Sequence, residues 1–213
     1  MIRKVFVDLF AGLGGASQAF YDDPQWFVVR IDNNEDLLQH TDGLTIANIA
    51  NVAETMDKIW AIFRMHNVII HTLDAFVVWA SPPCQEFSNA YNAIAATMAR
   101  NGQHYEPDMS LVEASMEIIS LLDPPFWYIE NVRGAITPFK PLLGKWRQQI
   151  GSFFVWGSFP LVAFDDSNDR SIRKFDERHS EMRAQIRAKV PLVISQALKN
   201  SIDHQKSLTY WFD

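Results

Sequence analysis

The chain contains one cysteine, Cys84, and its surroundings suit a nucleophile. Ser81, Pro82 and Pro83 precede it, and the two prolines fix the backbone just before the thiol. Because the apolar run 75–80 comes before them, we expect the thiol at the end of a strand and not within the core. A cysteine attacks as its thiolate, and a free thiol has a pKa of about 8.5. Cys84 therefore needs local help, from backbone dipoles, a cation or the substrate; the alternative is a buried apolar cysteine.

A second group of residues suits a cofactor. Three of the nine glycines fall within residues 12–15, directly after the apolar run 5–10, and glycines there let the backbone approach a ligand at the start of a helix. Asp32 closes the next apolar run, 27–31, where a carboxylate can accept hydrogen bonds from both ribose hydroxyls of an adenosine ligand. The spacing is not the G-x-G-x-x-G dinucleotide fingerprint. The alternatives are a tight strand-to-helix turn for the loop and a helix N-cap for Asp32.

A third chemical group is the carboxylate of Glu130, which closes the apolar run 126–129. A carboxylate at the end of a buried strand is unusual unless it has a partner. The structural alternatives for Glu130 are a helix N-cap or a buried ion pair.

The pattern of elements places these groups together. Apolar runs alternate with segments of helical spacing, and strands that are apolar throughout indicate a doubly wound, mostly parallel α/β sheet covered on both faces. Ligands of such sheets bind beyond the carboxyl ends of the strands, where all the groups above fall. The predicted strands are 5–10, 27–31, 44–49, 75–80 and 126–129, and the predicted helices are 15–21, 35–40, 52–65 and 110–122.

Two further features concern the second half of the chain. Ser110 and Glu113 form a capping-box pattern, which predicts that a helix begins at Ser110. The polar segment 85–109 is predicted to be a long loop with a helical turn near 93–98, and such loops are usually functional. Residues 153–159 are predicted to be β-like, 171–189 helical and 191–202 the last helix.

Composition limits the class of protein. With 213 residues, 48% hydrophobic and 21% charged, the chain suffices for one core and not for two full domains. A single cysteine excludes an intrachain disulfide and a cysteine-rich zinc site, so no metal is expected. No apolar run has membrane-spanning length, and the N-terminus leads straight into a strand-like run, so we expect neither a membrane segment nor a signal peptide and place the protein in the cytoplasm.

The charge distribution bears on nucleic-acid binding. The formal net charge of −6 counts against binding through the overall field of the protein. Residues 170–189, however, contain seven basic and three acidic side chains, and are therefore net positive by four. This segment suits either a phosphate-facing surface or a solvated helix face with internal ion pairs.

In combination, the motifs DLFAGLGG (8–15), SPPCQEFS (81–88) and ENV (130–132) resemble the C5-cytosine-specific DNA methyltransferase family. The closest resemblance is to small phage-type members that lack a full target-recognition domain. This implies the Rossmann-like fold of S-adenosylmethionine-dependent methyltransferases. It also implies that Cys84 adds to carbon 6 of cytosine, that Glu130 assists at nitrogen 3, and that carbon 5 receives the methyl group. The loop 85–109 resembles the one that closes over the flipped base.

The resemblance implies roles for further residues. Those expected at the cofactor are Phe10, Ala11, Gly12, Leu13, Gly14, Gly15, Asp32, Asn33, Asn48, Ile49, Pro82 and Ser195. Those expected to support the base or its loop are Ser81, Gln85, Ser88, Asn131 and Arg133. The expected partner is DNA containing cytosine, in a restriction-modification system or in phage DNA modification, inside a bacterium or a phage-infected cell.

The sequence departs from the family pattern in three ways. Asn48 stands where the family has an acidic residue against the adenine amino group. No arginine follows Gln148 and Gln149, where the family has a base-contacting arginine, and Arg147 precedes them. Only about 80 residues follow the ENV motif. We therefore expect one domain over 1–213, in which 144–213 completes the sheet and adds a short basic helical segment, and little sequence specificity.

Other functions stay open at this point. The same chemistry could act on a free cytidine nucleotide or on RNA. The chain could also be a catalytic subunit that needs a separate recognition partner, or a non-catalytic subunit. The presence of Cys84, Glu130 and the glycine loop together argues against a non-catalytic role.

Overall fold

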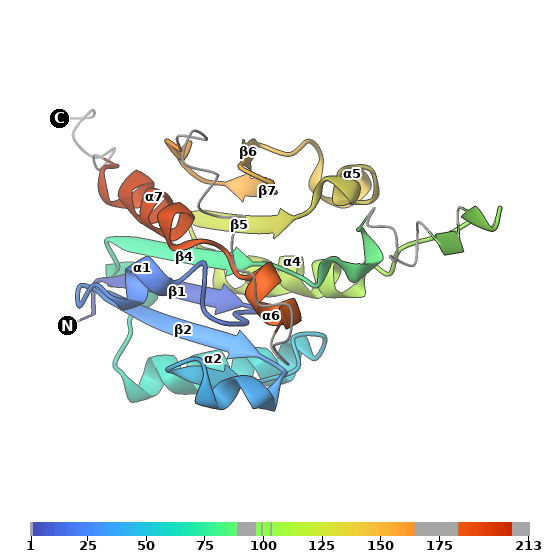
Figure 1. Ribbon diagram of the computed structural model, residues 1–213. Coiled ribbons are helices and arrows are strands. Elements are labelled where there is room, and N and C mark those ends of the chain that lie inside the picture. Colours follow the sequence, from blue (N-terminus) through green and yellow to red (C-terminus); the bar gives the residue numbers. More distant parts are fainter. Residues whose placement is uncertain (1, 89–96, 99, 103, 165–182, 206–213) are drawn as a thin grey trace.

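The computed structural model describes residues 2–88, 97–98, 100–102, 104–164 and 183–205 (Figure 1). Its centre is a seven-stranded sheet of order β3-β2-β1-β4-β5-β7-β6. The first five strands in this order are parallel, while β7 runs antiparallel to both β5 and β6. The strands are β1 (Lys4–Leu9), β2 (Trp26–Asp32), β3 (Leu44–Ile46), β4 (Ala75–Ala80), β5 (Phe126–Asn131), β6 (Gln148–Ile150) and β7 (Phe153–Ser158). The predicted doubly wound, mostly parallel sheet is confirmed.

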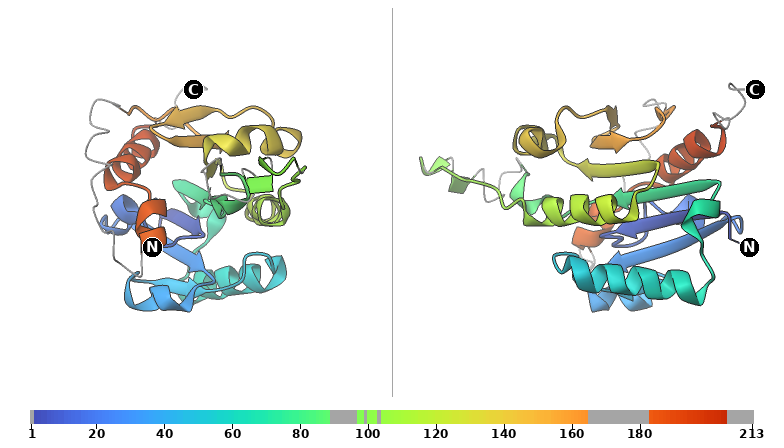
Figure 2. Two further views of the ribbon diagram at one scale, coloured as in Figure 1. Left: turned by 45° about the vertical axis from the view of Figure 1, so that its right-hand side comes forward. Right: turned by 180° about the vertical axis from the view of Figure 1, so that it is seen from behind.

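Helices cover both faces of this sheet (Figures 1 and 2). On one face, α2 (Val52–Met65) and α4 (Ser110–Leu122) pack on the side chains of Val5, Val7 and Leu9 in β1. On the other face, α1 (Gln18–Tyr21) and α7 (Leu192–Asp203) pack on alternate residues, among them Phe6, Val77 and Trp79. The central strands β1 and β4 are therefore buried on both sides, which explains why β4 is apolar throughout.

Shorter elements complete the chain. The 3-10 helices are η1 (Glu35–Gln39), η2 (Ile70–Thr72), η3 (Cys84–Glu86) and η4 (Arg133–Ala135), and the remaining α-helices are α5 (Ile136–Leu143) and α6 (Arg183–Ala188). No helix in the described ranges is long and apolar enough to cross a membrane.

Several predicted boundaries were wrong in detail. The predicted strand 44–49 ends at Ile46, and the predicted helix 15–21 shortens to the four residues of α1. The capping box at Ser110 is not formed: the N-cap of α4 is Met109, without a side-chain cap. Instead, the backbone N–H of Ser110 donates to Asp108 Oδ1 at 2.8 Å. The aspartate two residues earlier thus accepts a hydrogen bond at the start of the helix, where the capping box would have used the serine hydroxyl.

The C-terminal part of the chain joins the same sheet. The predicted β-like segment 153–159 is β7, and the predicted helix 191–202 is α7. Of the predicted helix 171–189, only α6 and the residue after it lie within the described residues. The predicted turn near 93–98 lies mostly outside them, and only Thr97 and Met98 are described, both helical.

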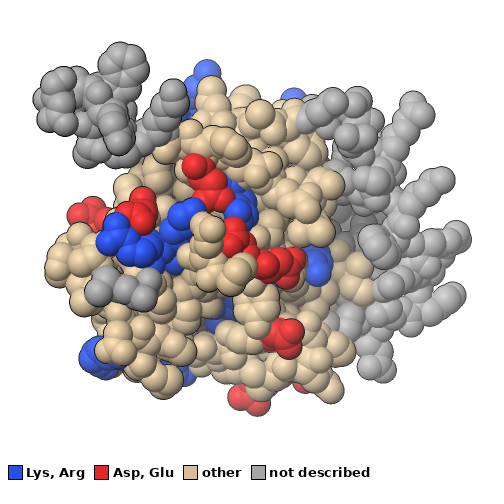
Figure 3. Space-filling view, turned by 90° about the vertical axis from the view of Figure 1, so that its left-hand side faces the viewer, with Lys and Arg blue, Asp and Glu red and all other residues tan. Residues whose placement is uncertain are grey.

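The edge of the sheet where the strands begin carries interspersed acidic and basic side chains (Figure 3). Ion pairs join α7 to the rest of the molecule: Lys199 contacts Asp23 at 2.7 Å, and Asp203 contacts Lys4 at 2.8 Å. Within α7, Lys199 also contacts Asp203 at 2.6 Å. Because acidic and basic side chains are interspersed, this face is not a basic surface that suits the phosphate backbone of a nucleic acid.

Candidate active site

The glycine loop leaves β1 in a backbone conformation that most residues avoid. Phe10, Gly12 and Gly14 have φ angles of 60°, 53° and 66°. The loop is held by hydrogen bonds from Ala11 N to Ile31 O at 2.9 Å and from Gly14 N to Ala11 O at 2.7 Å. The positive φ angles explain two of the glycines, because only glycine adopts this region without strain.

The remaining glycine is required by close packing. A Cβ atom at Gly15 would lie 2.4 Å from the carbonyl oxygen of Val190, so the loop touches the segment before α7 directly. At Gly12, by contrast, a Cβ atom would meet nothing closer than Phe10 O at 4.0 Å. Gly12 therefore presents open backbone, and Gly15 fixes the position of the C-terminal segment.

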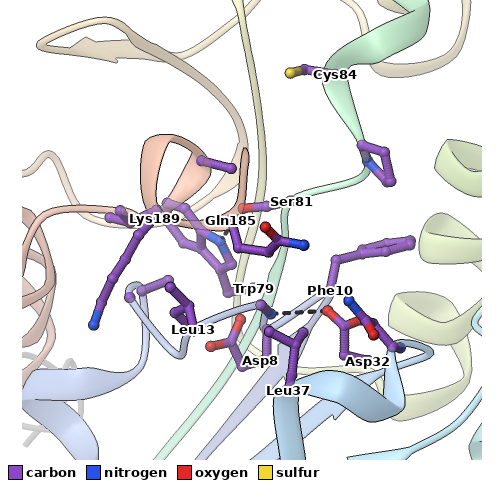
Figure 4. A pocket seen from close by; sticks show the side chains of 18 of the residues that line it. Asp8, Phe10, Leu13, Asp32, Leu37, Trp79, Ser81, Cys84, Gln185 and Lys189 are labelled. Carbon is purple, nitrogen blue, oxygen red and sulfur yellow. Dashed lines mark hydrogen bonds between the residues drawn. The ribbon is translucent and has the colours of Figure 1, made fainter. Parts of the chain in front are cut away.

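Asp32 ties the loop to the end of β2. Its Oδ2 atom accepts a hydrogen bond from Gly12 N at 2.9 Å, and its Oδ1 atom accepts one from Asn34 N at 3.0 Å (Figure 4). The N-cap of η1 is Asn34 and not Asp32, so the N-cap alternative for Asp32 was wrong. Each carboxylate oxygen keeps a lone pair for a further donor.

A single cavity of about 300 Å³ connects the glycine loop with the cysteine (Figure 4). Residues from β1, β2, β4, η1, η3 and α6 line it, so it lies beyond the carboxyl ends of the strands as expected. The lining residues singled out in the sequence are Phe10, Ala11, Gly12, Leu13, Gly15, Asp32, Asn33, Ser81, Cys84 and Gln85.

Several residues expected at the cofactor do not line this cavity. Gly14 packs against Arg30, since a Cβ there would lie 2.8 Å from the guanidinium carbon. Pro82 is buried, and Pro83 is the proline at the cavity wall. Asn48 is exposed and accepts a hydrogen bond from Ala50 N at 3.2 Å, in a local turn before α2.

Two more residues point into the core. Ile49 is buried within the hydrophobic cluster that includes α2. Ser195 is buried in α7, where its hydroxyl donates to Ala16 O at 2.6 Å and accepts from Ala19 N at 3.0 Å. Ser195 thus anchors α7 to α1, and its hydroxyl proton is already engaged in this contact.

Cys84 is the first residue of η3 and is half-buried at the mouth of the cavity. Its carbonyl oxygen accepts from Phe87 N at 3.0 Å and from Ser88 N at 2.9 Å, which fixes the turn that carries the thiol. Burial raises the pKa of the Cys84 thiol, and the charge of Glu130 raises this pKa further. No cation among the described residues lowers the pKa of Cys84. Of the expected sources of help for the thiol, namely backbone dipoles, a cation and the substrate, a cation is therefore not found in the described part of the protein.

Glu130 lies in β5, beside the end of β4, and is 8% exposed. Burial raises the pKa of its carboxyl group to about 7, although a hydrogen bond with Ser81 acts in the opposite direction. The N-cap of η4 is Val132, and no ion pair to Glu130 is found within the described residues, so both structural alternatives were wrong. Glu130 is a buried acid that is partly protonated at neutral pH.

A hydrogen bond joins the two strand ends that carry these groups, and further bonds hold each end locally. Asn131 Nδ2 donates to Pro82 O at 2.9 Å, and Asn131 Oδ1 accepts from Val132 N at 2.9 Å. Ser81 Oγ accepts from Trp79 Nε1 at 2.6 Å. The turn before Cys84 is therefore braced against β5.

Two arginines considered in the sequence lie away from the cavity. Arg133 is exposed in η4. Arg147 donates from Nε to Phe159 O at 2.9 Å, and its guanidinium lies 5.4 Å from the centre of the Phe159 ring. Arg147 is thus engaged at the β7 side of the sheet.

The sequence reasoning missed part of the cavity wall. Asp8 lines the cavity from β1, and Gln185 and Lys189 reach it from the C-terminal segment. Asp8 is 1% exposed, and burial raises its pKa to about 7, opposed by a hydrogen bond to Ser17 and the charge of Arg30. A signal was present: like Glu130, Asp8 is an acid within an apolar run.

The cavity lies at the carboxyl ends of the parallel strands of a mixed α/β sheet. Residues 5–151 match the family model for C-5 cytosine-specific DNA methylase. Since this match covers more than half of the 213 residues, the chain belongs to the C-5 cytosine-specific DNA methylase family. Members of this family are S-adenosylmethionine-dependent methyltransferases.

Two solved structures of methyltransferases match parts of this chain. The Entamoeba histolytica methyltransferase EhMeth matches with a TM-score of 0.46 and 14% identity, over 78% of this chain and 56% of that one. A protein described as a DNA modification methyltransferase encoded within an E. coli prophage matches with a TM-score of 0.44 and 17% identity, over 77% of this chain and 49% of that one. The chain thus spans about half the length of these structures. The comparison with curated proteins gave no match.

Proposed function

We propose that this protein transfers a methyl group from S-adenosylmethionine to carbon 5 of cytosine in DNA. The observation that carries the proposal is the shared position of a thiol and a buried acid. Cys84 follows β4 at the mouth of the cavity, Glu130 lies in the adjacent β5, and the charge of Glu130 perturbs the thiol. Membership of the C-5 cytosine-specific DNA methylase family agrees with this chemistry.

The cavity fits the proposed cofactor. Asp32 keeps acceptor capacity for ribose hydroxyls, and Gly12 leaves open backbone beside it. Phe10 and Leu37 supply apolar wall for a nucleoside, and Asp8 supplies a buried oxygen without a partner. The cofactor, when bound, supplies an electrophilic methyl group.

Each protein group then has a defined part in the reaction. The Cys84 thiolate forms a bond to carbon 6 of the cytosine, and the electron pair of the C5–C6 double bond becomes available at carbon 5. Protonated Glu130 donates to nitrogen 3, so that negative charge does not build up on the ring. After carbon 5 has taken the methyl group, its proton passes to solvent and the electron pair it leaves behind restores the C5–C6 double bond. The C6–S bond breaks with its electron pair returning to Cys84, and nitrogen 3 returns its proton to Glu130.

Glu130 is suited to this role because of its environment. A carboxyl group with a pKa of about 7 is protonated in a substantial fraction of molecules at neutral pH, whereas an ordinary glutamate is not. Asn131 donates to the carbonyl oxygen of Pro82 and so braces the turn before Cys84 against β5, which supports fixed relative positions of the thiol and the acid. In duplex DNA the target base would have to leave the stack to reach them.

The test is methyl transfer from labelled S-adenosylmethionine to DNA, RNA or dCMP, with Cys84→Ala as the matched variant. We expect label at carbon 5 of cytosine in DNA, and none with Cys84→Ala. DNA containing 5-fluorocytosine should trap the wild-type protein covalently, because fluorine replaces the proton at carbon 5 and cannot leave as that proton does. Label that persists in Cys84→Ala would disprove the covalent mechanism.

The other arms of this experiment separate the alternatives. Label confined to dCMP or to RNA would disprove DNA as the substrate while keeping the chemistry. Activity that needs an added cell extract would indicate a separate recognition subunit. DNA binding should also weaken steeply as salt rises, whereas nucleotide binding should not.

A further inference from the structure

Trp79 lies near the end of β4, Ser81 follows that strand directly, and both residues line the cavity (Figure 4). Trp79 is buried, and its indole Nε1 donates to Ser81 Oγ at 2.6 Å. An indole nitrogen can only donate, so Ser81 accepts in this bond and keeps its single hydroxyl proton for another acceptor. The indole N–H therefore restricts the directions in which the hydroxyl proton of Ser81 can point.

The register of β4 and β5 brings Glu130 to Ser81. The two strands are parallel and pair Trp79 with Tyr128, whose rings lie 5.3 Å apart. Side chains two residues apart in a strand share a face, so Ser81 and Glu130 lie on the face that carries Trp79 and Tyr128. The carboxyl group of Glu130 forms a hydrogen bond with Ser81 there. Trp79, Ser81 and Glu130 are thus joined in series.

Ser81 is the partner that favours the ionised form of Glu130. Cys84, from η3, is coupled to Glu130 only through charge. On the other side of Glu130, β7 places Val155, which has no titratable group. The guanidinium of Arg147 is bound to a backbone carbonyl oxygen. Among the described residues, only Ser81 therefore opposes the effect of burial on the carboxyl group.

We infer that Trp79 and Ser81 are positioning residues for Glu130: the indole N–H engages the oxygen of Ser81 and so directs the hydroxyl proton to the carboxylate. The inference rests on the proposed function, in which Glu130 gives a proton to cytosine and later recovers it. Burial favours the protonated carboxyl group, whereas a hydrogen bond to the ionised form opposes this effect. The two effects together keep both forms of the acid accessible near neutral pH, as proton exchange with the substrate requires.

The experiment measures kcat/KM against pH in the wild type and in three variants. In Ser81→Ala the fall on the alkaline side should move to higher pH by about one unit, as for the loss of one hydrogen bond to a charged group. Trp79→Phe keeps an aromatic ring but lacks the N–H, and should shift the fall in the same direction by less, because the hydroxyl of Ser81 can then turn. Ser81→Thr restores the hydroxyl and should keep the wild-type profile.

A second readout does not require activity. The free energy of unfolding falls as pH rises through the pKa of Glu130, because the folded protein then holds a buried charge. In Ser81→Ala this fall should extend to a pH about one unit higher, since the carboxylate has lost its donor. The control is Ser115→Ala: this serine is buried in α4 and donates to Leu111 O of the same helix at 2.6 Å, so its removal should keep the wild-type pH dependence.

Three outcomes would contradict the inference. An alkaline fall in Ser81→Ala that stays at the wild-type pH or moves to lower pH would overturn it, and so would an unchanged pH dependence of unfolding. A profile of Trp79→Phe identical to the wild type would overturn the role of Trp79. A wild type that transfers no methyl group would refute the proposed function, and the unfolding measurement would still decide whether Ser81 stabilises the ionised acid.

Discussion

Glu130→Gln is expected to stabilise the fold at alkaline pH while it removes activity. The carboxyl group of Glu130 is buried, and burial raises its pKa from an ordinary value of 4.5 to about 7. Above pH 7 the folded protein must therefore hold a buried charge. Glutamine has nearly the same shape and can still hydrogen-bond to Ser81, but it carries no charge and cannot donate a proton.

The magnitude follows from the difference between the two pKa values. A difference of about 2.5 pH units, at 1.36 kcal/mol per unit, corresponds to about 3 kcal/mol. Because the pKa is raised in the folded state, the favourable contribution is complete below the unfolded-state pKa and is lost as pH rises through about 7. Most of this loss falls between pH 5 and pH 8, and Glu130→Gln should be free of it.

The assay is urea denaturation at pH 5 and pH 8, followed by the fluorescence of the seven tryptophans. Relative to wild type, Glu130→Gln should gain about 2 to 3 kcal/mol in free energy of unfolding between the two pH values. Methyl transfer should fall by about a hundredfold or more. Glu117→Gln, at an exposed position on α4, is the control and should keep the wild-type pH dependence. If Glu130→Gln keeps it as well, Glu130 does not bear the penalty of a buried charge.

Three further predictions follow from the same geometry. The pH dependence of kcat/KM should be bell-shaped, because the fraction of Cys84 thiolate rises with pH while Glu130 loses its proton above about pH 7. Glu130→Gln should remove the fall on the alkaline side. A pH profile that this substitution leaves unchanged would contradict the assignment of Glu130. Gly15→Ala should weaken S-adenosylmethionine binding about tenfold or more in equilibrium dialysis, since the new methyl group would meet Val190 O at 2.4 Å; unchanged binding would show that the contact is dispensable. Ser195→Ala should lower the free energy of unfolding by about 1 to 3 kcal/mol, because two hydrogen bonds are lost. The affinity of the folded protein for the cofactor should stay unchanged. A loss of affinity without a loss of stability would instead place Ser195 at the ligand.

The sequence predicted the fold well where one physical signal dominated. Strands such as β4 are buried on both faces, so every residue from Ala75 to Ala80 is apolar and the run is conspicuous. The carboxyl-end rule then placed Asp32, Cys84 and the glycine loop at one cavity, and the structure brings them together there. Short elements were less predictable, because the four residues of α1 have too little periodicity to mark a boundary.

The sequence did not predict correctly which residues line the cavity where the answer depends on the direction in which a side chain points. Asn48 and Ile49 follow β3 in the expected position, but the chain turns there toward α2 and directs Ile49 into the core. Asp8 was overlooked because a strand alternates its faces, and only the assembled sheet shows that Asp8 shares the cavity face with Trp79. Gln185 comes from a segment far along the chain, and no local pattern indicates its approach.

The contact between Gly15 and Val190 has a consequence for the order of folding. The wall of the cavity consists of the earliest loop in the chain and of a segment about 175 residues later, held by Ser195 and by the ion pairs of Lys199. Contacts so distant in sequence form late, because a long stretch of chain must first be ordered between them. On the ribosome, the sheet can assemble while the cavity is still open on one side. The cofactor site should therefore be complete only when α7 packs on the sheet. A tightly bound ligand would stabilise this final state and shift the folding equilibrium toward it.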